Sequence, residues 1–375
     1  MIKVNEFFDE LYNMHIRFFS GVPDSLLKNI CAYITDHTQR HNHIIAANEG
    51  GAVALASGYH LASGDIPMVY MQNSGIGNAI NPLLSLTDKE VYSIPVLLMI
   101  GWRGEPGVKD EPQHIKQGKV TTSLLDSAGI PYFVIDAETN FKQVITESVK
   151  LCAATSAPVA LIIKKDTFEP YSLQSKQVQN FTMTREEALE NIVKHIEPDA
   201  VIVSTTGMLS RELFELRKKH KQNHQSDFLT VGSMGHASQI ALGIALLKPN
   251  KKVYCLDGDG AVLMHAGGMG IIGSSRPLNF NHIVFNNASH DSVGGQPTIA
   301  DKIDFTLYAK ANQYNFIECV DSKEKLSYEF ENMKKQNGPN FLEIRISKGA
   351  RKDLGRPTTS PFENKDIFMK FLSQE

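Results

Sequence analysis

The sequence has few cysteines, and they are not clustered. Cys31, Cys152, Cys255 and Cys319 lie far apart along the chain, and no Cys-x-x-Cys pair occurs. This spacing excludes a local zinc-finger or iron–sulfur motif. It is typical of thiols that stay reduced, so we expect a cytoplasmic protein.

Long apolar runs and an excess of charge are also absent. No stretch approaches the roughly 18 consecutive apolar residues of a membrane helix, and the acidic first residues do not form a signal peptide. A net charge of −3 and a pI near 6.5 provide no basic surface for nucleic acid. We therefore expect a small-molecule substrate, with neither nucleic acid nor a membrane as partner.

The order of apolar runs predicts two α/β domains. At 375 residues the chain is long for one core. Strand-like runs alternate with helical patterns twice, which indicates two doubly wound parallel sheets. The segment Thr184 to Glu187 matches a capping box and predicts the start of the first helix of the second domain. The expected strands are residues 17–20, 67–71, 95–100, 132–135 and 158–163, then 200–204, 253–256, 282–285 and 341–346.

Polar clusters follow two neighbouring strands of the second domain. Asp257-Gly258-Asp259-Gly260 follows the 253–256 run, and Asn286-Asn287 follows the 282–285 run. The carboxyl ends of parallel strands form the ligand-binding edge of such a sheet. A carboxylate and a carboxamide suit Mg²⁺, and glycines allow a sharp turn close to phosphate. Each cluster alone is also compatible with an ordinary turn.

Together the two clusters resemble the signature of thiamine diphosphate (ThDP) enzymes. The resemblance implies ThDP and Mg²⁺ as cofactors, with Asp259, Asn287 and the carbonyl of Ser289 as metal ligands. It also implies paired domains without a middle domain: a pyrimidine-binding domain at 1–170, a linker at 171–183 and a diphosphate-binding domain at 184–375.

Glu49 begins a helix of small residues, Asn48 to Tyr59, that resembles the glutamate-bearing helix of this family. There the glutamate hydrogen-bonds the pyrimidine nitrogen and helps the cofactor to remove its own thiazolium proton. The alternative is a glutamate that only stabilises the first turn of its helix.

Further cofactor contacts are implied by loops in the second half. Gly232 to Ala237 resembles the family loop in which a bulky side chain, here Met234, bends the cofactor; the alternative is a core methionine. Ser204 to Gly207 joins a strand to a helix, and we expect its backbone and hydroxyl groups to contact the diphosphate. The expected cofactor-binding residues are Glu49, Thr206, Gly207, Ser233, Met234, Gly258, Asp259, Gly260 and Asn287.

Two further residues are candidates for proton transfer. Gly21-Val22-Pro23-Asp24 resembles a segment of 2-oxo acid decarboxylases with a proton-transferring aspartate, although Asp24 could instead cap a helix starting at Ser25. Asp110-Glu111-Pro112-Gln113-His114 lies in an expected loop and resembles a stretch of phosphonopyruvate and sulfopyruvate decarboxylases. The resemblance makes His114 a candidate proton relay.

The cations near the C-terminus bear on the substrate. Residues 348–357 carry Arg351, Lys352 and Arg356, which are either an anion site or a solvated tail. The segment resembles the ending of phosphonopyruvate decarboxylases.

The resemblance implies a lyase of phosphonate biosynthesis that decarboxylates 3-phosphonopyruvate to phosphonoacetaldehyde and CO₂. It also implies a homo-oligomer with active sites between chains. The alternatives are a sulfopyruvate decarboxylase or another ThDP enzyme of a small anionic 2-oxo acid, a ThDP oxidoreductase or carboligase, and a non-catalytic homologue.

Overall fold

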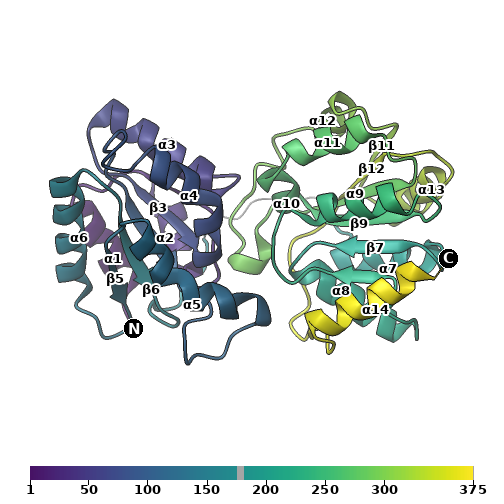
Figure 1. Ribbon diagram of the computed structural model, residues 1–375, viewed down its shortest axis with the longest axis horizontal. Helices are drawn as coiled ribbons and strands as arrows, with labels where there is room; N and C mark the ends of the chain where they lie inside the picture. The colour runs from purple at the N-terminus through teal and green to yellow at the C-terminus, as the bar shows by residue number, and fades with distance from the viewer. Residues whose placement is uncertain (175–180, 375) are drawn as a thin grey trace. The chain divides into compact units, whose positions relative to one another are not determined.

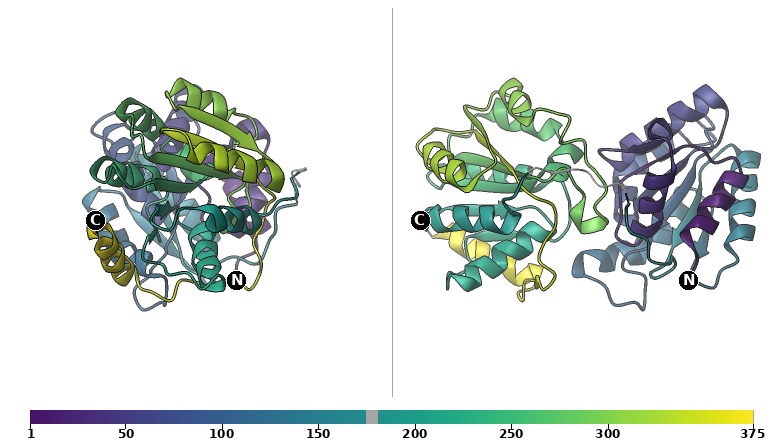
Figure 2. Two further views of the ribbon diagram at one scale, coloured as in Figure 1. Left: turned by 90° about the vertical axis from the view of Figure 1, so that its right-hand side faces the viewer. Right: turned by 180° about the vertical axis from the view of Figure 1, so that it is seen from behind.

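The computed structural model describes residues 1–174 and 181–374, which form two compact units. The first unit contains residues 1–177, with the short segment His290–Gln296 grouped with it, and the second contains residues 178–289 and 297–375. Each unit is a parallel sheet covered by helices on both faces (Figures 1 and 2). The predicted fold class is therefore confirmed.

The sheet of the first unit has the strand order β2-β1-β3-β4-β6-β5. Its strands are β1 (Phe19–Gly21), β2 (His43–Ile45), β3 (Met68–Gln72), β4 (Leu97–Gly101), β5 (Tyr132–Ile135) and β6 (Val159–Ile163). Its α-helices are α1 (Val4–Asn13), α2 (Lys28–His37), α3 (Glu49–Ser63), α4 (Ile76–Ser85), α5 (Pro112–Ser127) and α6 (Phe141–Thr155), with 3₁₀ turns η1 (Arg40–Asn42) and η2 (Asn73–Gly75).

Alternation along the strands divides the core of this unit into two layers. Tyr70 and Met99 pack toward α1, α2 and α6, whereas Met71 and Leu98 pack toward α3, α4 and α5. The central strands β3 and β4 are almost wholly buried, which explains their continuous apolar runs.

The sheet of the second unit has the strand order β11-β12-β10-β9-β7-β8. Its strands are β7 (Val201–Ser204), β8 (Asp227–Leu229), β9 (Val253–Gly258), β10 (Phe280–Asn286), β11 (Phe316–Val320) and β12 (Asn340–Arg345). Its α-helices are α7 (Arg185–His195), α8 (Met208–Lys219), α9 (Ala237–Leu247), α10 (Asp259–Met264), α11 (Gly267–Ser275), α12 (Phe305–Ala311), α13 (Lys323–Lys334) and α14 (Pro361–Ser373). The 3₁₀ turn η3 (Asp291–Val293) belongs to the segment grouped with the first unit.

Two layers also form the core of the second unit. Tyr254 and Leu256 pack with α7, α8 and α13, whereas Val253 and Cys255 pack with α9, α11, α12 and α14. The capping box at Thr184 is present and begins α7.

All nine expected strands are present, with bounds that shift by a few residues. The sequence interpretation missed β2, β8 and β11. Residues 175–180 of the expected linker lie outside the described residues, so the domain boundaries stay a prediction. Within the described residues, every helix is too short or too polar to cross a bilayer.

Candidate active site

In the second unit, Asp259 and Asn287 lie at the carboxyl ends of neighbouring strands. Asp259 follows β9 and begins α10, and Asn287 follows β10. The Asn287 N–H donates a hydrogen bond to the Asp259 carboxylate, so the two residues are in contact. Thr298 Oγ1 donates to Asp259 Oδ2 at 2.5 Å. The structure thus brings together the two residues expected to share a metal ion.

Asp259 is a carboxylate whose charge needs compensation. It is only 3% exposed. Burial raises its pKa to about 7, although the hydrogen bonds from Thr298 and from backbone N–H groups act in the opposite direction. A divalent cation would favour the ionised form. The residues present therefore fit a magnesium site.

The turn after β10 is fixed by polar contacts. Ala288 has a φ of +53°, which directs the chain back past Asn287. The Ser289 N–H donates to Asn287 Oδ1 at 3.0 Å. Beneath the turn, Asn286 Nδ2 donates to the buried Glu343 at 2.7 Å, and Arg345 lies 3.2 Å from the same carboxylate. The Asn287 to Ser289 turn is therefore held in one conformation.

The glycines beside Asp259 do not form the expected sharp turn. Gly258 has extended backbone with φ −111°, and β9 leads directly into α10. A Cβ on Gly258 would meet nothing within 4 Å. Gly258 thus leaves open space at the strand end, as a ligand site requires, but without a turn.

The other expected cofactor residues of this unit follow β7 and β8. Thr206 and Gly207 come after β7, and Gly207 adopts φ +103° at the start of α8. Ser233 and Met234 lie between β8 and α9, and neither is buried. Met234 is therefore not a core methionine. Because β10, β9, β7 and β8 are parallel neighbours, all of these segments lie along one edge of the sheet.

In the first unit, Glu49 is buried at the first position of α3. It is 5% exposed, and Asn78 Nδ2 donates to its Oε2 at 2.8 Å. Asn48 caps the helix by accepting the Gly51 N–H at 2.8 Å. A Cβ on Gly75 would lie 2.5 Å from Glu49 Oε1. The carboxylate is therefore held by α4 and by a glycine that leaves room for it.

Asp24 is fully buried and accepts two hydrogen bonds. Gln72 Nε2 donates to Oδ1 at 2.6 Å, and the Leu26 N–H donates to Oδ2 at 2.9 Å. The second bond caps the turn that precedes α2, so the capping interpretation is correct in part. Gln72 is the last residue of β3, and its position in the sequence did not predict this contact with Asp24.

His114 lies in the first turn of α5, which begins at Pro112, and not in the expected loop. Proline at the first helical position loses no hydrogen bond, which explains the earlier start. His114 is 9% exposed, and its Nδ1 has no hydrogen-bond partner among the described residues. Burial lowers its pKa, and the Arg103 charge lowers it further.

The loop before α5 is fixed by an ion pair that the sequence did not reveal. Arg103 Nε donates to Asp110 Oδ2 at 2.8 Å, and a second guanidinium nitrogen binds Oδ1. Arg103 Nη1 also donates to Ser25 Oγ at 2.6 Å, beside Asp24. Burial tends to raise the pKa of Asp110, but the hydrogen bonds from Arg103 and from backbone N–H groups outweigh it and hold the pKa well below its usual range. The pair links the α5 loop to the Asp24 segment.

An open anion site requires cations that are free to bind a ligand, but Arg351 is already paired with carboxylates. Arg351 contacts the carboxylates of Glu186, Glu215 and Asp353, with 3.1 Å to Glu186. Lys352 and Arg356 are exposed. Arg351 therefore anchors the C-terminal segment to the second unit, and a role in substrate binding stays a prediction.

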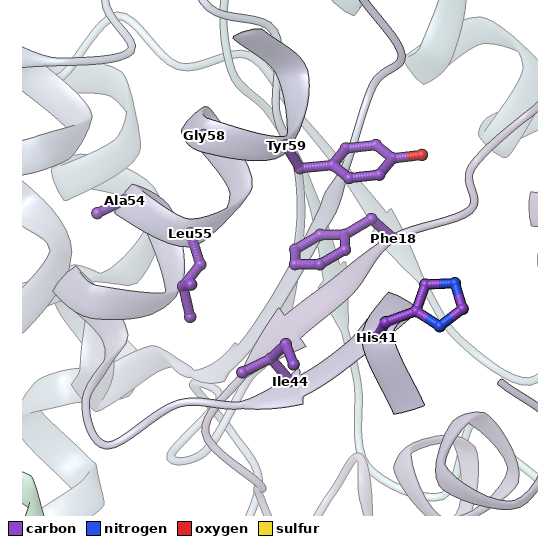
Figure 3. A pocket seen from close by; sticks show the side chains of 7 residues that line it. All are labelled: Phe18, His41, Ile44, Ala54, Leu55, Gly58 and Tyr59. Carbon is purple, nitrogen blue, oxygen red and sulfur yellow. The ribbon is translucent and has the colours of Figure 1, made fainter. Parts of the chain in front are cut away.

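A hollow of about 600 Å³ in the first unit lies on another part of the surface (Figure 3). Its walls are mainly apolar, and the rings of Phe18 and Tyr59 stack with centroids 4.6 Å apart. None of Glu49, Asp24 and His114 lines it. Its lining residues are Phe18, His41, Ile44, Ala54, Leu55, Gly58 and Tyr59.

Comparison with known families agrees with the geometry of both units. Residues 4–125 match the N-terminal TPP-binding domain of thiamine pyrophosphate enzymes, and residues 205–344 match their C-terminal TPP-binding domain. The chain belongs to the thiamine pyrophosphate enzyme family. The first match includes Glu49, and the second includes Asp259 and Asn287. Membership in this family makes thiamine diphosphate the expected occupant of the site.

Two similar proteins align with the whole chain, and a third aligns with most of it. A phosphonopyruvate decarboxylase of Streptomyces viridochromogenes is 32% identical over 100% of this chain and 96% of its own. One of Streptomyces hygroscopicus is 31% identical over 100% and 95%. A sulfopyruvate decarboxylase of Methanosarcina acetivorans is 28% identical over 88% and 87%.

Proposed function

We propose that this chain is a ThDP- and Mg²⁺-dependent decarboxylase that converts 3-phosphonopyruvate to phosphonoacetaldehyde and CO₂. The observation that carries the proposal is that each unit has one buried acid at the start of a helix. These acids are Glu49 in the first unit and Asp259 in the second. ThDP enzymes need both, one for each end of the cofactor. The full-length similarity to phosphonopyruvate decarboxylases supports the substrate.

Magnesium would be held by Asp259, Asn287 and the Ser289 carbonyl. These oxygen donors suit a hard cation that also binds diphosphate oxygens. The fixed turn from Asn286 to Ser289 presents the ligands without further ordering. Bound ThDP would supply the electron sink for decarboxylation.

Glu49 would accept a hydrogen bond from the pyrimidine ring. Asn78 already donates to Oε2, which leaves Oε1 for the ligand. Because the side chain is buried, water competes weakly for that bond. The role of Glu49 is thus to accept the hydrogen bond of the pyrimidine ring at Oε1 and so to orient the ring.

Proton transfer at the substrate is assigned to Asp24 and His114. His114 is suited to accept a proton at Nδ1, because its lowered pKa keeps the imidazole neutral at pH 7. Both carboxylate oxygens of Asp24 already accept hydrogen bonds. This difference favours His114 as the group that moves the proton and Asp24 as the group that orients its surroundings.

Sulfopyruvate is the alternative substrate, because a sulfopyruvate decarboxylase aligns over most of the chain. The two substrates differ only in the anionic group. The deciding experiment is a turnover panel of phosphonopyruvate, sulfopyruvate and pyruvate with ThDP and Mg²⁺, measuring CO₂ and aldehyde without an electron acceptor. We expect the highest kcat/KM with phosphonopyruvate. A higher value with sulfopyruvate would reassign the substrate, and aldehyde formation only with an acceptor would contradict a non-oxidative lyase.

We also propose that the protein is a homo-oligomer with each active site built between chains. The apolar outer face of α3 supports an oligomer, since Leu55 is 42% and Leu61 is 73% exposed. Ala54 and Gly58 on the same helix are exposed and small, which allows close packing against another helix. Exposed apolar surface of this kind marks an interaction site.

A further inference from the structure

Beneath the candidate magnesium site, three side chains with metal-binding atoms meet in the core of the second unit. Cys255 and Asp257 are two residues apart on β9, and His282 is paired with Cys255 on β10. The alternation of side chains therefore places all three on one face of the sheet. Their ligand atoms all lie within 4.8 Å of one another, and none of the three residues is more than 1% exposed.

Two atoms of this cluster lack a hydrogen-bond partner among the described residues. They are Asp257 Oδ2 and His282 Nε2, which lie 3.5 Å apart. Leaving a buried polar atom unpaired costs about 1–3 kcal/mol. Ligand atoms around one tetrahedral ion are roughly 3.4 Å apart, given metal–ligand distances near 2.0–2.2 Å. The separation suits two ligands of one ion better than a direct hydrogen bond.

The other ring nitrogen of His282 has a polar neighbour, as is usual for a histidine that binds a metal. His282 Nδ1 lies 3.3 Å from the Tyr314 hydroxyl. A contact at Nδ1 orients the ring so that Nε2 faces Asp257 and Cys255. Ligating histidines usually have such a partner on the second nitrogen.

We propose that Cys255 Sγ, Asp257 Oδ2 and His282 Nε2 are three of the ligands of a buried Zn²⁺ ion. A thiol and an imidazole favour Zn²⁺ over Mg²⁺, which prefers oxygen ligands. Binding would release the thiol proton of Cys255, and the thiolate and the carboxylate would then balance the two positive charges. The ion would join β9 to β10, the strands whose ends carry Asp259 and Asn287. This inference does not depend on the proposed substrate.

Elemental analysis tests the proposal on the full chain. Protein expressed with added zinc is dialysed against EDTA and then against Mg²⁺, and zinc is measured by mass spectrometry. We expect about one zinc ion per chain in the wild type and at least a tenfold loss in Cys255→Ser and His282→Gln. Cys31→Ser, which removes a buried thiol of the first unit, is the matched control and should keep its zinc.

Two further measurements distinguish zinc at Cys255, Asp257 and His282 from zinc bound at the magnesium site. Asp259→Ala should keep the zinc, whereas loss of zinc in that variant would place the ion at the magnesium site and overturn the proposal. Wild-type protein produced with Co²⁺ should show thiolate-to-cobalt absorption in the near ultraviolet, a result that stands even if the Cys255 variant does not fold. A wild type without zinc and without this absorption would show that Asp257 and His282 form a metal-free pair.

Discussion

Single residues carry the chemistry of the proposed enzyme, and their surroundings explain why. Glu49, Asp24, His114 and Asp259 are all buried, although charged and polar groups normally stay exposed. Glu49 and Asp24 are held by hydrogen bonds from neighbouring side chains. Burial lowers the pKa of His114 and raises the pKa of Asp259. Such groups cluster at functional sites.

Glu49→Gln should separate cofactor binding from cofactor activation. The amide keeps the shape of the side chain but removes the carboxylate, so we expect ThDP affinity to change by only a few fold and kcat to fall by about 10²–10⁴-fold. Calorimetry measures the affinity, and NMR measures exchange of the thiazolium C2 proton. The exposed Glu90→Gln serves as control. An unchanged C2 exchange rate in Glu49→Gln would remove the residue from the mechanism.

The pH dependence of turnover should depend on His114. Because burial lowers its pKa below the usual 6.5, His114 stays neutral at pH 7 and gains a proton only on the acidic side of pH 6.5. The wild-type kcat should therefore fall below that pH. His114→Gln should lower kcat by about 10²-fold at pH 7 and lose this acidic decline. The exposed His41→Gln should keep the wild-type profile, and an identical acidic decline in His114→Gln would assign it to another group.

Individual site residues differ in how far the sequence could predict their neighbours. The contact of Asp259 with Asn287 follows from two adjacent strand ends, which motif spacing reveals. The contacts of Asp259 with Thr298 and of Arg103 with Asp110 depend on the path of irregular loops. The positive φ of Ala288 sets the path of the loop after β10. A glycine would have indicated such a conformation in the sequence, but the residue is alanine.

At the scale of elements, the predicted strands were those with continuous apolar runs. Such runs are typical of central parallel strands, which are buried on both faces. The missed strands β2, β8 and β11 are at the edges of their sheets, and include polar residues such as His43, Asp227 and Glu318. Their positions are set by pairing with a neighbour and not by their own composition.

The junction of η2, α3 and α4 gives a prediction at this scale. Gly75→Ala would place a methyl group 2.5 Å from Glu49 Oε1 and displace the carboxylate from Asn78. We expect kcat to fall at least about 10-fold, as in other cases where a small displacement disturbs catalytic geometry. Gly77→Ala lies in α4, where a Cβ meets nothing within 4 Å, and should leave kcat unchanged. Equal kcat values for the two variants would show that Glu49 does not need its present position.

At the scale of the whole molecule, the residues proposed to bind and activate ThDP are divided between the two units. The first unit carries Glu49, Asp24 and His114, and the second carries the candidate metal ligands. The sequence predicted this division because each half repeats an α/β pattern with its own motif. The assembly of the halves into complete sites is a proposal about chains, which one chain's sequence does not encode directly.

The apolar face of α3 should be buried in an oligomer. A Leu55→Asp, Leu61→Asp double variant would place two charges there, so we expect the mass measured by light scattering to fall toward the 41.6 kDa of one chain. Turnover should fall with it. Tyr328→Asp on α13, where Tyr328 is 67% exposed, is the control. A fully active wild type with the mass of a single chain would contradict the proposed assembly.

The most direct test of the central claim is a calorimetric titration of the protein with ThDP in Mg²⁺ buffer. The account predicts about one ThDP per chain, loss of binding in EDTA, and loss of binding in Asp259→Ala but not in the exposed control Asp301→Ala. Unchanged ThDP affinity in Asp259→Ala would contradict the claim that this carboxylate holds the metal of the cofactor.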